Sequence, residues 1–324
     1  MIAIVLMAIA AGSASALMFA SIMSGALISL LLFYLAPLPL MVAALGWGPL
    51  SATIGGIAAA SGLIPVFGLP YGIAFAVMVA LPAWWLGHLA LLGRPMTNGV
   101  APGDGAAPVA PDLEWYPVGR ILLSISGFAA LTTMATLLTL GTDAETITGA
   151  LRQFFLRVIG PHSAAPAGDT GQLIDALVTI APAGAVIFAT VTLTLNLWLA
   201  ARITATSGRL HRPWPDLNSA NLPPMTLAAS CVAIALCFTG GLTAMLALIV
   251  TAALMMAYAL IGFAVLHTLT QTLKSRAFWL GATYAVMVVF VWPVLAMVFL
   301  GLADAVFGIR LRILQKRPPP LPAS

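Results

Sequence analysis

The chain has 324 residues, of which 61% are hydrophobic and 7% are charged. Soluble domains carry roughly 25% charged residues. With a mean hydropathy of +1.08, this chain has more apolar surface than a soluble fold of its size can bury. The 13 basic residues, against 9 acidic ones, stand almost wholly between apolar runs. Basic residues in such places set the orientation of a membrane protein, and nothing in their pattern indicates nucleic-acid binding.

Long charge-free stretches predict helices that cross a lipid bilayer. Asp, Glu, Lys and Arg are absent before Arg94, and also from 217–273 and 277–303. About 20 apolar residues span the ~30 Å hydrocarbon layer, where a charge is costly. The runs are continuous, whereas strands of a membrane barrel alternate in polarity. We therefore predict an all-α fold, a polytopic transmembrane helix bundle of eight or nine spans, in contact with the lipid bilayer.

Apolar runs and their breakers give the spans in chain order. We predict them at 2–23, 26–47, 49–67, 70–93, 118–140, 173–201, 223–240, 242–270 and 277–302. Interleaved apolar and basic residues at 147–159 predict a short interfacial helix.

The same pattern predicts four sections of chain. Residues 1–93 form an N-terminal block of four charge-free spans, and 118–308 form a block of four or five. Pro, Gly and Ala predict a flexible aqueous loop at 94–117. Residues 309–324 are a basic, proline-rich tail that we expect to be disordered at its end.

Charge only partly decides the orientation. An inside N-terminus with nine spans puts seven basic residues in inside loops and six outside. Lys274, Arg276 and the basic tail all favour the cytoplasm, yet a single predicted span separates them. Either the number of spans is eight or the tail is exported. We keep the N-terminus inside because the short internal loops agree with it.

A stripe of small residues runs along the first span. Ala8, Gly12, Ala16 and Ala20 recur every fourth residue, a spacing that lets helix backbones approach closely in lipid. Packing within the chain is the interpretation we favour for this stripe. The alternative is that the first span docks another membrane protein.

Two prolines interrupt the second span. Pro37 and Pro39 each remove a helical hydrogen bond, and discontinuous membrane helices expose backbone groups that can bind substrates. A purely structural kink is the alternative. Asn196 is an amide within an apolar run and needs a partner. Our candidate residues for a substrate pocket are Tyr34, Pro37, Pro39, Tyr71, Asp175, Thr179 and Asn196.

Residue patterns for catalysis are missing from the sequence. The four histidines are scattered, and no catalytic, metal-binding or cofactor-binding set appears, so we expect neither an enzyme nor a cofactor. We also find no acidic residue or Lys/Arg pair within the core of a predicted span. Since ion-coupled pumps normally need intramembrane carboxylates, we expect a passive binder, a partner-driven subunit or a scaffold.

Several motifs resemble the YybS-like family of uncharacterised bacterial membrane proteins. They are Phe33 to Pro39, Leu45 to Trp47, Leu81 to Gly87, Leu113 to Pro117 and Gly301 to Asp304. The family is in turn distantly similar to S components of energy-coupling-factor transporters, which use an Ala-x-x-x-Ala stripe on the first helix to dock a coupling subunit. Ala16 and Ala20 match that spacing. This chain exceeds the usual six helices of an S component by two or three.

The resemblance implies a multi-pass protein of the bacterial cytoplasmic (inner) membrane. We expect small-molecule binding or a transport-associated role without an ATPase of its own, with a small-molecule ligand and a membrane protein partner reached through the first helix. The alternative is a non-transporting scaffold or regulator in envelope biogenesis.

Overall fold

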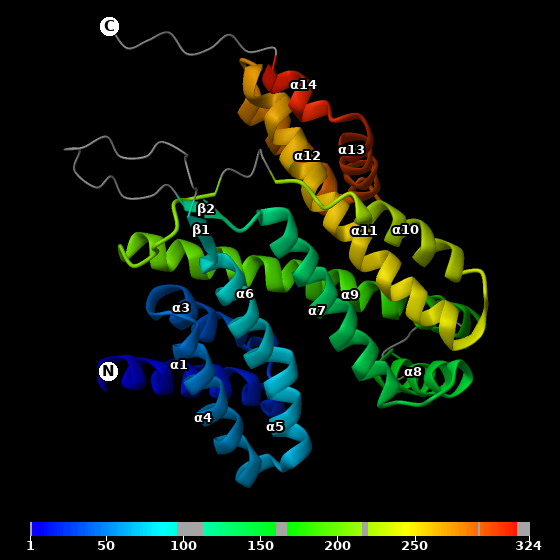
Figure 1. Cartoon of the computed structure of the whole chain (residues 1–324). Coiled ribbons are helices and arrows are strands. Elements are labelled where there is room, and N and C mark those ends of the chain that lie inside the picture. Colours follow the sequence, from blue (N-terminus) through cyan, green and yellow to red (C-terminus); the bar gives the residue numbers. More distant parts are fainter. Residues whose placement is uncertain (1, 96–112, 160–166, 216–219, 291, 316–324) are drawn as a thin grey trace, which may run out of the picture. The chain divides into compact units, whose positions relative to one another are not determined.

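The computed structural model describes residues 2–95, 113–159, 167–215, 220–290 and 292–315, and these are almost entirely helical (Figure 1). Seven of the described helices are long and apolar enough to cross a membrane, and two shorter apolar helices accompany them. The predicted all-α, polytopic class is therefore confirmed. The chain divides into two compact units, one of Met1–Ile121 with Thr192–Pro215, the other of Leu122–Val191 with Asp216–Ser324. The predicted division into sequence blocks stays a prediction.

Unit 1 contains the first four predicted spans, and all four are confirmed as helices. Its elements are α1 (Ile2–Ala20), α2 (Leu27–Leu35), α3 (Pro37–Trp47), α4 (Pro49–Phe67), α5 (Leu69–Phe75) and α6 (Leu81–Leu91). A 3₁₀ turn at Ser21–Ser24 extends α1, and a π-helical turn at Ala76–Ala80 joins α5 to α6.

Close helix packing in unit 1 depends on glycine. α1 packs on α4, and a Cβ atom at Gly12 would overlap the carbonyl group of Gly55. A Cβ at Gly55 would in turn overlap the carbonyl of Ala8. Lipid provides no hydrophobic drive for such a pair, so the van der Waals attraction between closely approaching backbones stabilises it.

A short strand pair stands at the ends of the predicted 94–117 loop. β1 (Gly93–Pro95) pairs antiparallel with β2 (Leu113–Trp115), with Gly93 opposite Trp115. Arg94 and Glu114 face each other across this ladder and form an ion pair of 2.6 Å. The prediction of a loop without structure is therefore wrong at its two ends, and 96–112 lies outside the described residues.

Unit 2 holds most of the remaining helices. They are α7 (Val118–Leu138), α8 (Ala144–Ile159), α9 (Ala167–Thr206), α10 (Met225–Leu236), α11 (Gly241–Leu269), α12 (Arg276–Val289), α13 (Val294–Phe307) and α14 (Ile309–Gln315). α7 and α9 are shared, because the first four residues of α7 and the last part of α9 belong to unit 1. At 40 residues α9 is about 60 Å long, roughly twice the hydrocarbon thickness, and it extends beyond the predicted 173–201 at both ends.

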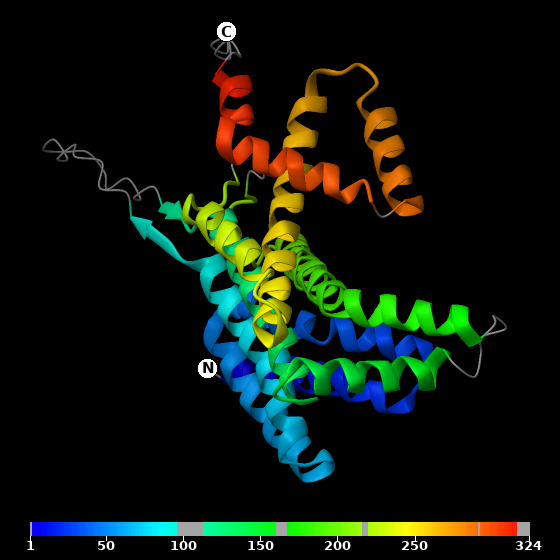
Figure 2. The ribbon, with the colours of Figure 1, turned by 90° about the vertical axis from the view of Figure 1, so that its right-hand side faces the viewer.

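Two predicted spans differ from the structure. The segment 223–240 contains a helix of only 12 residues, α10. The segment 277–302 is not one span, because α12 ends at Val289 and α13 begins after Pro293. Figure 2 shows α12 and α13 running in different directions. Pro293 cannot continue the hydrogen bonding of a preceding helix, so an uninterrupted apolar run here hides a turn.

Glycines also form the closest helix packing of unit 2. α11 packs on α13, and a Cβ at Gly262 would overlap the Met297 carbonyl. A Cβ at Gly301 would overlap the Tyr258 carbonyl. Each unit therefore has its own closely packed helix pair, in which a glycine of each helix lies against the backbone of the other.

The predicted short helix at 147–159 is confirmed as part of α8. Asp143 caps it, accepting hydrogen bonds from the Thr146 N–H at 2.8 Å and from the Thr146 hydroxyl at 2.7 Å. These bonds hold the pKa of the Asp143 carboxyl below its usual range. Phe154, Leu156 and Val158 are exposed on α8, a composition typical of a helix that lies at a membrane surface.

Candidate functional site: polar contacts at two helix junctions

The first site is the junction of α2 and α3, where the two prolines stand. α2 ends at Leu35 and α3 begins at Pro37, so the predicted interruption of the second span is confirmed. Pro37 and Pro39 supply no N–H groups to the carbonyls of Phe33 and Leu35, four residues earlier. Between these two positions, Asn196 of α9 binds the backbone of α2, because its Nδ2 donates to the Tyr34 carbonyl at 2.8 Å. The structure thus joins two of the predicted pocket residues.

Asn196 is fully buried, and its hydrogen bonds fix the orientation of its amide. Nδ2 also donates to the Thr192 carbonyl at 2.9 Å, so both of its protons are directed at carbonyl oxygens. A flipped amide would aim its oxygen at those two acceptors. Oδ1, by contrast, has no hydrogen-bond partner among the described residues. The junction therefore presents one buried, unused acceptor.

Tyr71 binds the backbone near a second helix end in unit 1. Its hydroxyl donates to the Phe19 carbonyl at 3.1 Å, in the last turn of α1. The Phe19 ring contacts the rings of Phe33, Tyr71 and Phe75 with centroids 5.0 to 5.5 Å apart. Because Phe33 precedes Tyr34, this aromatic cluster adjoins the α2–α3 junction in sequence.

Asp175 and Thr179 belong to unit 2. Both are exposed; Asp175 pairs with Arg152 at 3.2 Å, and the Thr179 hydroxyl donates to the Asp175 carbonyl at 2.9 Å. Their membership of one pocket with Tyr34 and Asn196 stays a prediction. At the junction itself, Pro37 is buried and Pro39 is half-buried.

The small-residue stripe of the first span divides into two halves. Ala8 and Gly12 are buried, and Gly12 lies against α4 within the same molecule. At these two positions the first span packs within the chain, which is the interpretation we favoured from the sequence. Ala16 and Ala20 are half-buried, so the docking prediction is left with these two residues.

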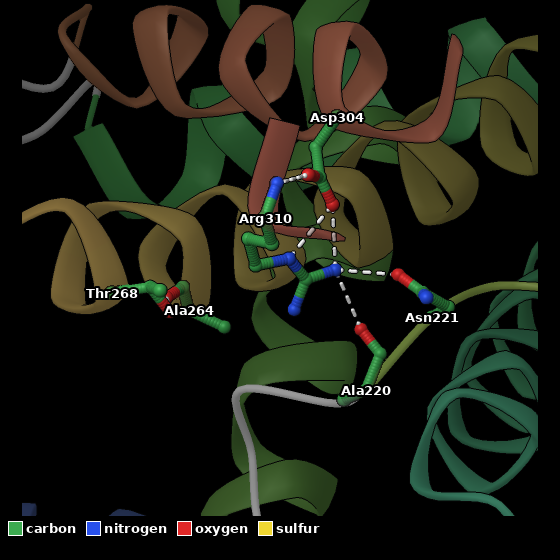
Figure 3. A network of polar contacts seen from close by, with 6 residues as sticks. All are labelled: Ala220, Asn221, Ala264, Thr268, Asp304 and Arg310. Atoms are coloured by element: carbon green, nitrogen blue, oxygen red, sulfur yellow. Dashed lines mark hydrogen bonds and ion pairs between the residues drawn. The ribbon is translucent and has the colours of Figure 1, made fainter. Parts of the chain in front are cut away.

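The second site, in unit 2, is a buried ion pair (Figure 3). Arg310 Nη2 lies 2.7 Å from Asp304 Oδ2, and both side chains are 3% exposed. Arg310 Nε donates to Oδ2 at 2.7 Å, and the Arg310 backbone N–H donates to Oδ1 at 2.8 Å. Nη2 also donates to the Ala220 carbonyl at 2.8 Å and to Asn221 Oδ1 at 2.6 Å. The network thus ties the segment before α10 to the end of α13.

This ion pair corrects two predictions. The sequence indicated no buried acidic residue in the apolar spans, but α13 extends past 302 and buries Asp304. The sequence also placed Arg310 in a basic tail, whereas it lies in α14 and is buried. Gly308, at φ 63°, makes the left-handed turn between the two helices. A glycine four residues after an acidic residue and two before an arginine was the signal that sequence reasoning missed.

Arginines and aromatic rings gather at the helix ends of unit 1. The half-buried Arg212 donates to the Ala90 carbonyl at 3.1 Å and to the Tyr116 carbonyl at 3.0 Å. Its burial lowers the pKa of its guanidinium.

Within the described ranges, no three His, Cys, Asp or Glu side chains come together as they would around a metal ion.

The fold and these two sites define a class, that of polytopic α-helical membrane proteins with polar groups buried at helix junctions. The chain belongs to the family described as predicted membrane protein (DUF2232), whose model matches residues 120–305, more than half of the chain. The matched region includes Asn196 and Asp304 but ends before Arg310. No curated protein and no solved structure matches the chain.

Proposed function

We propose that this membrane protein binds a small molecule at the α2–α3 junction and serves transport as a partner-driven subunit without an ATPase or other enzymatic activity of its own. The observation that carries the proposal is the unused acceptor of Asn196, which is fully buried. A buried polar atom left without a hydrogen bond costs about 1–3 kcal/mol. A bound molecule that donates an N–H or O–H group to Oδ1 removes that cost.

The junction favours a largely apolar molecule that carries a hydrogen-bond donor. Its polar groups are an amide and main-chain carbonyls, all of them neutral, so they do not offset the cost of burying a charged ligand. Tyr34, 36% exposed, and the half-buried Phe33 beside it supply flat apolar surface. Binding sites for small molecules commonly combine such surface with a few polar groups.

The finer parts of the proposal rest on the resemblance to S components. We place the protein in the bacterial cytoplasmic membrane, with a coupling partner that contacts the first helix. Because Gly12 already packs on α4, the partner would contact Ala16 and Ala20. The resemblance, more than any contact, supports a role in transport.

Native mass spectrometry of the purified full-length protein tests the binding site. We expect wild-type protein to retain a co-purified small molecule and Asn196→Leu to lose it. Thr204→Val is the matched control, because Thr204 is equally buried on α9 and its hydroxyl bonds only to carbonyls of its own helix among the described residues. We expect the control to keep the bound molecule.

Other results would overturn the proposal. Equal loss from both variants would mean that retention depends on α9 as a whole and not on the Asn196 acceptor. Repeated absence of any small molecule from wild-type protein, together with a stable protein partner, would instead favour the alternative function, a scaffold or regulator in envelope biogenesis.

A further inference from the structure

Two exposed arginines in unit 1 lie over tryptophan rings at the ends of apolar helices. The Arg202 guanidinium carbon is 5.0 Å from the centroid of the Trp214 ring and 5.8 Å from that of the Trp198 ring. The Arg209 guanidinium carbon is 4.7 Å from the Trp47 ring centroid. We call these five residues the basic–aromatic rim.

The charge of the rim is not balanced by a described carboxylate. Neither Arg202 nor Arg209 forms an ion pair with any residue that the structure describes. Glu114 is the acidic residue described in unit 1, and it is paired with Arg94. Both rim arginines are exposed, so two positive charges stand open to an anionic group.

The backbone that carries the rim is held in place. Arg212 anchors the segment after α9 to the ends of two other elements, through its bonds to the carbonyls of Ala90 and Tyr116. Arg209 and Trp214 flank this anchor in sequence, and the Arg209 and Leu210 N–H groups both donate to the Thr204 carbonyl. Arg209 therefore stands on a fixed loop, and Arg202 stands on α9, four residues before its end.

Stacking orients a guanidinium for anion binding. When a guanidinium lies over an aromatic face, its N–H donors remain in its own plane and can meet the oxygens of a phosphate in pairs. Tryptophan prefers the headgroup layer of a bilayer. The exposed rings of Trp198, about two turns before the end of α9, and of Trp214, in the segment after it, favour that layer for the rim. A phosphate at that depth belongs to a lipid.

We propose that the basic–aromatic rim binds the phosphate of an anionic phospholipid, with Arg202 and Arg209 as its ligands. The tryptophan rings contact the glycerol and upper acyl region of the same lipid. This site is separate from the α2–α3 junction and does not depend on the function proposed for it.

Lipid titration followed by native mass spectrometry tests this site in full-length, detergent-purified protein. Wild-type protein is expected to bind phosphatidylglycerol more tightly than phosphatidylcholine of the same acyl chains. The double variant Arg202→Gln/Arg209→Gln should weaken phosphatidylglycerol binding roughly 10- to 30-fold, because each basic residue near an anionic surface strengthens binding about fivefold. Lys274→Gln/Arg276→Gln, which removes two exposed basic residues of unit 2, should leave it within about twofold.

Three outcomes would overturn the proposal. Equal weakening by both double variants would show a general charge effect, and equal binding of the two lipids would remove the role of anionic charge. Displacement of the lipid by an equal concentration of inorganic phosphate would identify a site for free phosphate. Because both substituted side chains are exposed, unchanged thermal unfolding of the variants is the check that they remain folded.

Discussion

A buried polar side chain binds the backbone at each of the two helix junctions, but the chemistry of the two contacts differs. At the α2–α3 junction of unit 1, a neutral amide donates to the Tyr34 carbonyl beside the two prolines, and its own oxygen has no hydrogen-bond partner among the described residues. At the α13–α14 junction of unit 2, a carboxylate takes both a backbone N–H and a guanidinium, which bonds onward to Ala220 and Asn221. The first junction thus leaves one buried amide oxygen without a described partner, while at the second the carboxylate and the guanidinium are bonded within the protein.

This difference indicates separate roles for the two junctions. A buried ion pair needs further hydrogen bonds to offset the removal of its charges from water, and the Asp304–Arg310 network has them. It is therefore suited to holding helices together. A single amide oxygen without a described partner adds no bond to the fold, and the proposed binding site rests on it.

Breaking the ion pair should have the largest effect. Asp304→Leu leaves the Arg310 guanidinium buried without its counter-charge, which should lower the free energy of unfolding by about 3–5 kcal/mol. Equilibrium unfolding in mixed detergent micelles measures it. The double variant Asp304→Leu/Arg310→Met should recover most of that loss; a double variant as unstable as the single one would contradict a dominant role for the unpaired charge.

Removing the amide of the other junction should have an intermediate effect. Asn196→Leu leaves the Tyr34 carbonyl without that donor, and we expect a loss of about 1–2 kcal/mol in the same unfolding measurement. Thr204→Val, with its hydroxyl bonded to its own helix, should cost less than about 0.5 kcal/mol. If the two variants were equally stable, the amide would contribute nothing to holding the interrupted helix.

Removing an exposed ion pair should change the free energy of unfolding least. Arg94 and Glu114 are paired at 2.6 Å, but their side chains are 81% and 53% exposed. Arg94→Gln should therefore change the free energy of unfolding by only about 0–0.5 kcal/mol, and less at high salt. A loss as large as that of Asp304→Leu would mean that burial is not what separates the two pairs.

Much of the fold could be predicted from the sequence because lipid imposes simple rules on it. A span must be long, apolar and helical, and the first four spans follow directly from charge-free sequence and its Gly and Pro breakers. The proline interruption was equally visible, since proline acts locally on the backbone. The same rules failed at 277–302, because an apolar run says nothing of whether a helix turns back within it.

The polar sites were predicted only in part, since their contacts join distant positions. Asn196 was identified as an amide in need of a partner, but its bond to Tyr34 spans 162 residues and has no local sequence signal. Asp304 and Arg310 are six residues apart, yet they meet only because the left-handed Gly308 ends α13 and turns the chain between them. By hydropathy, Asp304 falls just past the predicted span 277–302, and Arg310 falls in the predicted tail.

The β1–β2 ladder brings the two chain positions on either side of 96–112 together. Gly93 pairs with Trp115, and the Tyr116 N–H donates to the Leu92 carbonyl at 2.9 Å, so the two paired strands lie about 5 Å apart. A reporter protein whose termini lie close together could be inserted between residues 96 and 112 with short linkers on either side. Its fluorescence or enzymatic activity would then reveal which compartment the ladder faces, and one such fusion would settle the sidedness of every helix in unit 1.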